Sequence, residues 1–292
     1  MGTIASRAES LLGTAVVATT PVAGGDVCVA TRLRLSDGRS ALVKTRPHAP
    51  EGFFAVEGRG LRWLVTVGGA DVPEVFACSD DCLIMAWVEP GRPTPEAAEA
   101  FGRALAATHA AGAACFGAAN DGYIATLPLS NRPAPSWPEF WSHRRVLPYL
   151  KAARDRSAVT PAEQAAIEAL LTRIDDVAGP HEPPARLHGD LWSGNLVWGG
   201  DGKVWMVDPA AYGGHRETDL AMLALFGTPH LVRVLEGYDT VAPLAPGWQQ
   251  RVGLHQLHPL LVHAVLFGGG YGSRAAAAAR SVLERRPSRN DT

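Results

Sequence analysis

The sequence lacks several features that would indicate a class of protein directly. None of its four cysteines forms a C-x-x-C pair or has a histidine at the spacing of a metal site. No apolar run reaches ~18 residues, the length that spans a bilayer. The N-terminal stretch MGTIASRAES has no apolar segment typical of a secretion signal. These absences predict a cytoplasmic protein with reduced thiols that does not enter a membrane.

An excess of charge of either sign is also missing. Lysine and arginine number 27 against 29 acidic residues, which gives a net charge of -2. A general nucleic-acid binder normally carries a basic excess, so we expect no nucleic-acid partner. The 292 residues are 47% hydrophobic and 19% charged, which is typical of a globular chain with a large core. Nothing in the composition indicates an oligomer, and we expect a monomer.

The first part of the chain reads as short strands around one helix. Asp37-Gly38 marks a tight hairpin, and a second hairpin surrounds Asp80-Asp81. The predicted strands cover 14–22, 27–35, 40–45, 74–79 and 82–88, and the helical pattern covers 53–67. We therefore predict that residues 1–88 form a lobe with a five-stranded sheet and one helix.

After the segment EPGRP (89–93) the pattern becomes helical. Helices are expected from Thr94 to near Gly112, after the capping boxes at Ser136 and Thr160, from Thr228-Pro229, and over 246–267 and 273–286. Two short strands, 196–198 and 204–208, lie among them. The sequence thus predicts an α+β fold of two lobes, 1–88 and 89–292, with a ligand cleft between them.

The stretch LHGDLWSGNLVW (187–198) places polar groups between two apolar runs. Asp190 precedes Asn195 with four residues between them. A carboxylate within hydrogen-bond reach can take the proton of a hydroxyl group, and an amide oxygen can bind the Mg²⁺ of a nucleotide. Asp208 ends the next strand, where a second carboxylate can complete the metal site. The pattern therefore favours phosphoryl transfer.

Phosphoryl transfer also needs a cation beside the phosphates. Lys44 ends the third predicted strand, and Glu57, on the following helix, has the charge and position to hold its ammonium group. Gly24 and Gly25 would let backbone N–H groups approach the phosphates. This glycine pair lies between two strands and is not G-x-G-x-x-G, which argues against a dinucleotide-binding enzyme.

Together these motifs resemble the fructosamine kinases (ketosamine-3-kinases), a family of the protein-kinase-like superfamily that also contains the aminoglycoside phosphotransferases. The resemblance covers nearly the whole chain and is strongest in LHGDLWSGNLVW, MVDPAAYGGHRETDLAMLALFG and LHQLHPLLVHAVLFGGGYG. HGD-x4-N alone marks only the wider class, whereas HGDLWSGN with DPAAYGGHRETDLAM is specific to this family. The resemblance implies a bilobal kinase-like fold that uses ATP and Mg²⁺.

The resemblance also implies a role for each matching residue. Asp190 looks like the catalytic base, Asn195 and Asp208 like the Mg²⁺ ligands, and Lys44 like the phosphate-binding lysine held by Glu57. Further residues are candidates for binding or support: Met85 and Trp87 for ATP, Trp192 and His263 for the substrate, and His188 and Asp219 for bracing the catalytic loop.

Each of these residues also has an ordinary structural interpretation. Lys44 and Glu57 could be surface charges, Trp192 could be core packing, and a satisfied core histidine is the default for His263. For His215, Arg216 and Glu217 the sequence does not separate a substrate contact from a loop brace.

The leading hypothesis is a kinase that phosphorylates the 3-hydroxyl of a ribulosamine, erythrulosamine or fructosamine, with the amine either free or on a protein. The resemblance implies that the product breaks down and releases the amine, a deglycation repair. Two alternatives stay open: an aminoglycoside or amino-alcohol phosphotransferase, and a nucleotide-binding pseudokinase or scaffold.

Overall fold

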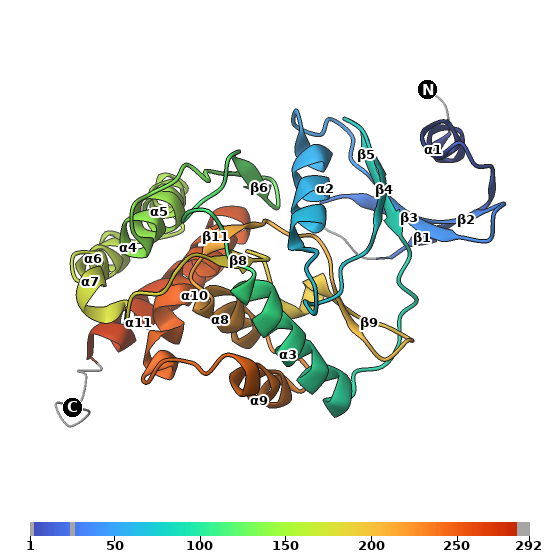
Figure 1. Cartoon of the computed structure of the whole chain (residues 1–292). Coiled ribbons are helices and arrows are strands. Elements are labelled where there is room, and N and C mark those ends of the chain that lie inside the picture. The colour runs from blue at the N-terminus through green and yellow to red at the C-terminus, as the bar shows by residue number, and fades with distance from the viewer. Residues whose placement is uncertain (1–2, 24–26, 285–292) are drawn as a thin grey trace.

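The computed structural model describes residues 3–23 and 27–284 and has two lobes, a sheet at one end and a helical part at the other (Figure 1). The fold class predicted from the sequence is confirmed. The elements of the smaller lobe are α1 (Ile4–Leu12), β1 (Val16–Val22), β2 (Val29–Leu35), β3 (Ser40–Thr45), α2 (Phe53–Leu64), β4 (Val75–Cys78) and β5 (Cys82–Ala86).

The five strands form one antiparallel sheet in the order β1-β2-β3-β5-β4. Alternate residues of β5 point to opposite faces, as the pleat of a strand requires. Ile84 packs with Leu33 in a cluster that includes residues of α1. Leu83 and Met85 pack with Phe54 of α2 on the other face. A helix therefore covers each face of the sheet, and α2 covers the face toward the larger lobe (Figure 1).

The larger lobe consists mainly of helices, with three pairs of very short strands inserted among them in the described part of the chain. Its helices are α3 (Pro95–Ala110), α4 (Trp137–Phe140), α5 (Leu147–Asp155), α6 (Pro161–Leu171), α7 (Ile174–Val177), α8 (Glu217–Leu225), α9 (Leu231–Val241), α10 (Trp248–Phe267) and α11 (Tyr271–Glu284). A π-helical turn (Trp141–Val146) joins α4 to α5. The strands are β6 (Gly122–Ile124), β7 (Leu127–Leu129), β8 (Ala185–Leu187), β9 (Leu196–Trp198), β10 (Val204–Met206) and β11 (Tyr212–Gly214).

The structure corrects three expectations about single elements. The smaller lobe holds a second helix, α1, so the prediction of one helix was wrong. Thr228 does not begin α9, because its hydroxyl donates to the carbonyl of Leu223 near the end of α8, and α9 begins at Leu231. The helical pattern after Phe53 ends at Leu64, since the chain is extended at Val65.

The two lobes meet closely at two places. Asp71 of the smaller lobe forms a β-bridge with Trp205 of β10. Gly60 of α2 lies against Pro209 so tightly that an added Cβ would stand 3.3 Å from the proline Cγ. This close approach places Glu57 of α2 beside the segment that follows β10. The predicted division of the chain at residue 88 stays a prediction.

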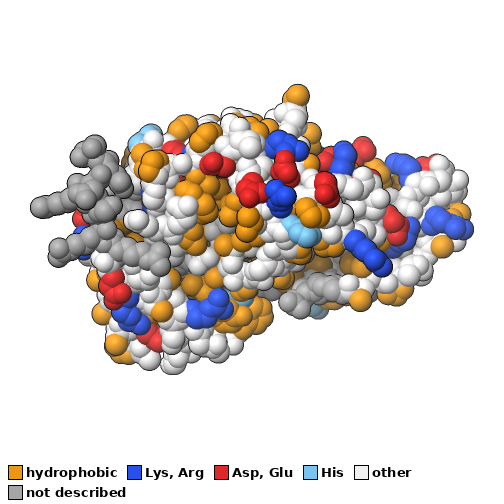
Figure 2. All heavy atoms as spheres, turned by 90° about the horizontal axis from the view of Figure 1, so that it is seen from below, with side chains coloured by type: hydrophobic (Ala, Val, Ile, Leu, Met, Phe, Trp, Pro, Cys, Tyr) orange, Lys and Arg blue, Asp and Glu red, His pale blue; other side chains and the backbone are white. Residues whose placement is uncertain are grey.

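The surface carries acidic and basic side chains side by side. Figure 2 shows both kinds interspersed on the face that contains α3 and α9. Two ion pairs on these helices are Arg103 with Glu99 and Arg233 with Glu236. Within the ranges 3–23 and 27–284, no helix is both long enough and apolar enough to cross a bilayer.

Candidate active site

Lys44 is buried where the lobes meet and contacts two carboxylates. Its Nζ lies 2.7 Å from Oε1 of Glu57 and 2.9 Å from Oδ1 of Asp208, 164 positions further along the chain. Burial acts to lower the pKa of Lys44, but the two carboxylates outweigh this effect and the pKa is raised. The Lys44 side chain is 9% exposed while that of Asp208 is 46% exposed, so this ion-pair network opens toward solvent on the Asp208 side. The alternative of a solvated Lys44–Glu57 surface pair is thereby excluded.

Asp190 and Asn195 lie together in the loop between β8 and β9. The Asn195 side-chain amide donates to the backbone carbonyl of Asp190 at 2.8 Å and to its Oδ2 at 3.1 Å. It also approaches the backbone carbonyl of Asp208 at 3.5 Å. Burial raises the pKa of Asp190 to about 7, against a smaller lowering by the bond from Asn195. The two predicted acids and the amide therefore converge in one place.

The backbone conformation at Asp208 aims its carboxylate at this site. Asp208 has φ of 56°, in the left-handed region that few residues other than glycine adopt. Aspartate tolerates this conformation better than most residues, because its short polar side chain can bond locally. The residue lies two positions beyond β10, and the next residue is a proline, so the strand ends before it.

His188 and Asp219 hold the catalytic loop from behind, and both are buried. His188 Nε2 donates to the carbonyl of Val207 at 2.8 Å, and its Nδ1 accepts from the N–H of Asp190 at 3.3 Å. This pair of bonds requires the neutral ring, and burial lowers the pKa of His188 accordingly. The Asp219 carboxylate accepts from the N–H groups of His188 at 2.7 Å and Gly189 at 3.0 Å.

Two residues that hold Asp219 from behind were not predicted from the sequence. His109 of α3 places Nε2 3.3 Å from Oδ2 of Asp219 and Nδ1 2.8 Å from the hydroxyl of Tyr238 on α9. All three side chains are buried. A lone histidine in an alanine-rich helix gives no pattern that points to a partner 110 positions away. The chain α9–α3–α8 thus connects the catalytic loop to the helical core.

The two predicted substrate residues lie in one aromatic cluster. Trp192 is 37% exposed, and its ring lies 5.9 Å from that of Phe226 at the end of α8. Phe226 in turn lies 4.8 Å from His263 of α10. His263 is half-buried, and its Nδ1 donates to the carbonyl of Pro259 at 2.8 Å. Trp192 is thus exposed and not part of the core, whereas His263 makes the hydrogen bond expected of a structural histidine, and a substrate contact of either residue stays a prediction.

The remaining predicted nucleotide residues are placed as follows. Met85 is buried against α2 at the end of β5. Trp87, just beyond β5, donates from its indole to Glu89 at 2.9 Å and stacks under the guanidinium of Arg32. Their contact with ATP stays a prediction. Gly24 and Gly25 lie outside the described residues.

The oxygen atoms suited to a divalent cation come from Asn195 and Asp208. In the described part of the chain, every hydrogen bond of the Asn195 side chain is made by its NH₂ group. The side-chain carbonyl oxygen of Asn195 is therefore available. Of the two carboxylate oxygens of Asp208, Lys44 contacts only Oδ1, so Oδ2 is available as well. Amide and carboxylate oxygens are the ligands that Mg²⁺ prefers. The donor set therefore fits this ion.

A second group of potential metal ligands is a structural brace. His215, Glu217 and His255 are buried with ligand atoms within 4.8 Å of one another. However, Arg251 bonds both oxygens of Glu217, at 2.6 and 2.9 Å. The Nδ1 of His215 accepts from the N–H of Glu217, so its Nε2 must carry the proton. A buried guanidinium and a protonated nitrogen exclude a cation here.

Arg216 has the same bracing role. It pairs with both oxygens of Glu182 at 2.8 Å and donates to the carbonyls of Ala242 and Pro243. Arg216 and Glu217 thus brace α8 against α10 and the loops beside them.

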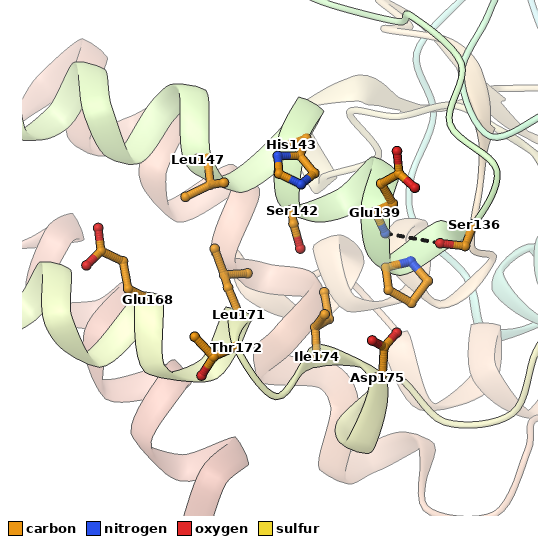
Figure 3. Close-up of a pocket in the computed structure, with 11 residues that line it drawn as sticks. Ser136, Glu139, Ser142, His143, Leu147, Glu168, Leu171, Thr172, Ile174 and Asp175 are labelled. Atoms are coloured by element: carbon orange, nitrogen blue, oxygen red, sulfur yellow. Dashed lines mark hydrogen bonds between the residues drawn. The ribbon is translucent and has the colours of Figure 1, made fainter.

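A cavity of about 560 Å³ lies away from this site, between the α4–α5 segment and the α6–α7 segment. Figure 3 shows the side chains of Ser142 and Leu171 facing each other across it, with Glu139 and Asp175 at one end. It shares no lining residue with the Lys44–Asp208 network. The cavity is therefore separate from the cluster formed by Lys44, Asp190, Asn195 and Asp208.

Comparison with known proteins agrees with this geometry. Residues 2–285 match the sequence profile of the fructosamine kinases. The chain belongs to the fructosamine kinase family. It is an ATP-dependent phosphotransferase with an alcohol group as acceptor.

Two relatives illustrate how far the likeness extends. A Thermus thermophilus protein named as a probable ketoamine kinase is 37% identical over 253 residues, which cover 86% of this chain and 88% of the relative. The crystal structure of a candidate fructosamine-3-kinase from Thermobifida fusca is 48% identical, with a TM-score of 0.92 over 97% of this chain and 99% of the other. A macrolide 2'-phosphotransferase from Brachybacterium faecium shares the fold alone, with 16% identity and a TM-score of 0.64 over 98% and 99% of the two chains.

Proposed function

We propose that this fructosamine kinase phosphorylates the hydroxyl at carbon 3 of a ketoamine sugar, with Mg²⁺·ATP as the donor. The observation that carries the proposal is the convergence of Lys44, Asp190, Asn195 and Asp208 from distant parts of the chain. Phosphoryl transfer depends mainly on positioning and on charge neutralisation, and this set of groups supplies both. The related ketoamine kinases support the class of acceptor.

Each residue has a defined part in the reaction. Asp190 accepts the proton of the sugar hydroxyl. At the same time the hydroxyl oxygen of the sugar forms a bond to the γ-phosphorus of ATP, and the bond between that phosphorus and ADP breaks. Lys44, held by Glu57, neutralises charge on the phosphates. Asn195 and Asp208 would hold Mg²⁺, which supplies further charge neutralisation when bound.

The bracing residues keep this geometry in place. Asp219 accepts hydrogen bonds from the backbone N–H groups of His188 and Gly189, and the His188 ring accepts one from the N–H of Asp190. Trp192 and His263 lie beside the catalytic loop and contact the acceptor. Loss of a proton from carbon 1 of the product forms an enaminol, which expels the phosphate from carbon 3, and water then hydrolyses the resulting imine and releases the amine. The activity is therefore a deglycation repair.

The decisive experiment is a coupled ADP-release assay across erythrulosamines, ribulosamines and fructosamines, with a panel of aminoglycosides and choline in parallel. The proposal predicts turnover with at least one ketoamine and none with the antibiotics or choline. Turnover restricted to the aminoglycosides or choline would replace it with one of the alternatives. ATP binding without turnover of any acceptor would indicate a pseudokinase.

A further inference from the structure

Two large aromatic side chains are exposed in the part of the chain that the structure describes, and both belong to the cluster beside the catalytic loop. Among the described residues, the other exposed large hydrophobic side chains are aliphatic, whereas Trp192 is 37% and Phe267 60% exposed. Exposed aromatic rings gathered in one place mark a contact surface more often than a core.

The rings form a row that begins at Trp192, two residues from Asp190, and branches at His263. From Trp192 and Phe226 it continues to His263, whose ring lies 5.5 Å from Phe267 and 5.1 Å from Tyr271. None of these five rings is fully buried. Four parts of the chain contribute to the row: the catalytic loop, the residue after α8, the last two turns of α10 and the first residue of α11. A molecule held at Asp190 can therefore extend along it.

The middle of the row offers a hydrogen-bond acceptor. His263 Nδ1 donates to the Pro259 carbonyl, so the neutral ring keeps a lone pair on Nε2. Burial lowers the pKa of His263, which keeps the ring neutral at pH 7. A ketoamine carries a secondary amine that is protonated at this pH. Aromatic faces and a neutral imidazole both favour such a cation.

The far end of the row carries the opposite charge preference. The guanidinium of Arg274 lies over the Tyr271 ring, 5.5 Å from its centroid. Arg274 is exposed and its side chain forms no ion pair among the described residues. A guanidinium held on an aromatic face is suited to a carboxylate at the rim.

We propose that the row Trp192–Phe226–His263–Phe267–Tyr271 is the subsite for the amine part of the acceptor, and that Arg274 selects amines whose apolar chain ends in a carboxylate. The preferred substrates are thus ketoamines of free amino acids and related small amino-carboxylates. This inference rests on the proposed function, because it assumes that a ketoamine sugar is held at Asp190.

The test uses one sugar, the best of the ketoamine series, attached to four amines. Methylamine reports on the sugar site alone. Hexylamine, aminohexanoate and diaminohexane add the same chain with a neutral, an anionic or a cationic end. The wild-type enzyme should prefer the aminohexanoate adduct over the hexylamine adduct by about two- to fivefold in kcat/KM, as expected for an exposed charge pair. The diaminohexane adduct should be the poorest of the three.

Three variants separate a specific contact from a general defect. Arg274→Gln should abolish the ranking by terminal charge, whereas Arg280→Gln, on the same helix, should preserve it. Phe267→Ala should raise KM for the three long adducts by about two- to tenfold and leave the methylamine adduct unchanged.

Each outcome bears on the inference. Equal kcat/KM for the three long adducts in the wild type would overturn it, as would a ranking that survives in Arg274→Gln. An equal loss for all four adducts in Phe267→Ala would reduce the row to a structural role. Failure of the methylamine adduct and all longer adducts to react would instead overturn the proposed function, and this inference with it.

Discussion

Asp219 gives the sharpest test of how the catalytic loop is held. Its buried carboxylate accepts bonds from the backbone N–H groups of His188 at 2.7 Å and Gly189 at 3.0 Å. In Asp219→Asn the side chain keeps one acceptor oxygen and turns an NH₂ group toward the other donor. One buried N–H is then left without an acceptor, at a cost of about 1–3 kcal/mol, and the remaining bond loses its charge assistance.

The combined loss should be about 2–4 kcal/mol of unfolding free energy. For a chain of this size, such a loss lowers Tm by roughly 3–7 °C. Turnover should fall by about 100-fold, because a displacement of ~1 Å at the loop misplaces the Asp190 carboxylate. The Kd for Mg²⁺·ATP should change little, since Lys44 and Asp208 do not contact Asp219.

Calorimetry and steady-state kinetics on the same preparation measure these effects. Asp175→Asn is the matched control, because Asp175 is exposed and far from the loop, and it should behave as the wild type. An Asp219→Asn protein with wild-type Tm and wild-type turnover would refute the bracing role.

Three other predictions concern charge and the acceptor site. The buried His258 has its pKa lowered from 6.5 to about 3, so between these values the unfolded chain binds a proton that the folded chain does not. Lowering the pH from 7 to 5 should therefore reduce the free energy of unfolding by about 2 kcal/mol more in the wild type than in His258→Asn. Urea unfolding at both pH values measures this difference, and an equal reduction in the two proteins would contradict the prediction. Lys44→Met should weaken Mg²⁺·ATP binding and cost about 3–5 kcal/mol by leaving Glu57 buried without its cation. Adding Glu57→Gln should restore part of that stability in a double-mutant cycle but not the binding of Mg²⁺·ATP. Trp192→Ala should raise KM for the ketoamine and leave KM for ATP unchanged, and a reversed pattern would place the indole elsewhere.

The motifs predicted the site better than they predicted its connections. Asp190 and Asn195 are close in sequence, so their spacing alone was enough to pair them. Lys44 and Asp208 are 164 positions apart, and no spacing rule reports such a contact. The left-handed backbone at Asp208 was equally hidden, since nothing local distinguishes it from an aspartate at the end of an ordinary strand.

The fold shows the same limit at the level of elements. Long strands with alternating burial, such as β2, were predicted within two residues. The pairs β8–β11 and β6–β7 have three residues per strand, too few for a period of two to be recognised, whereas the equally short β9 and β10 were found from the glycine-rich turn between them. α1 has an apolar stripe as marked as that of α2, but its nine residues are too short a stretch for a helical period to be recognised reliably.

The central claim is that Asp190 takes the proton of a sugar hydroxyl where Lys44, Asn195 and Asp208 hold the nucleotide. Single-turnover transfer of labelled γ-phosphate to the preferred ketoamine by the wild type and by Asp190→Asn, with Kd for Mg²⁺·ATP measured in parallel, tests it most directly. The account predicts a loss of about 10²- to 10⁴-fold in the transfer rate with nearly unchanged nucleotide binding. Transfer by Asp190→Asn at the wild-type rate would contradict it.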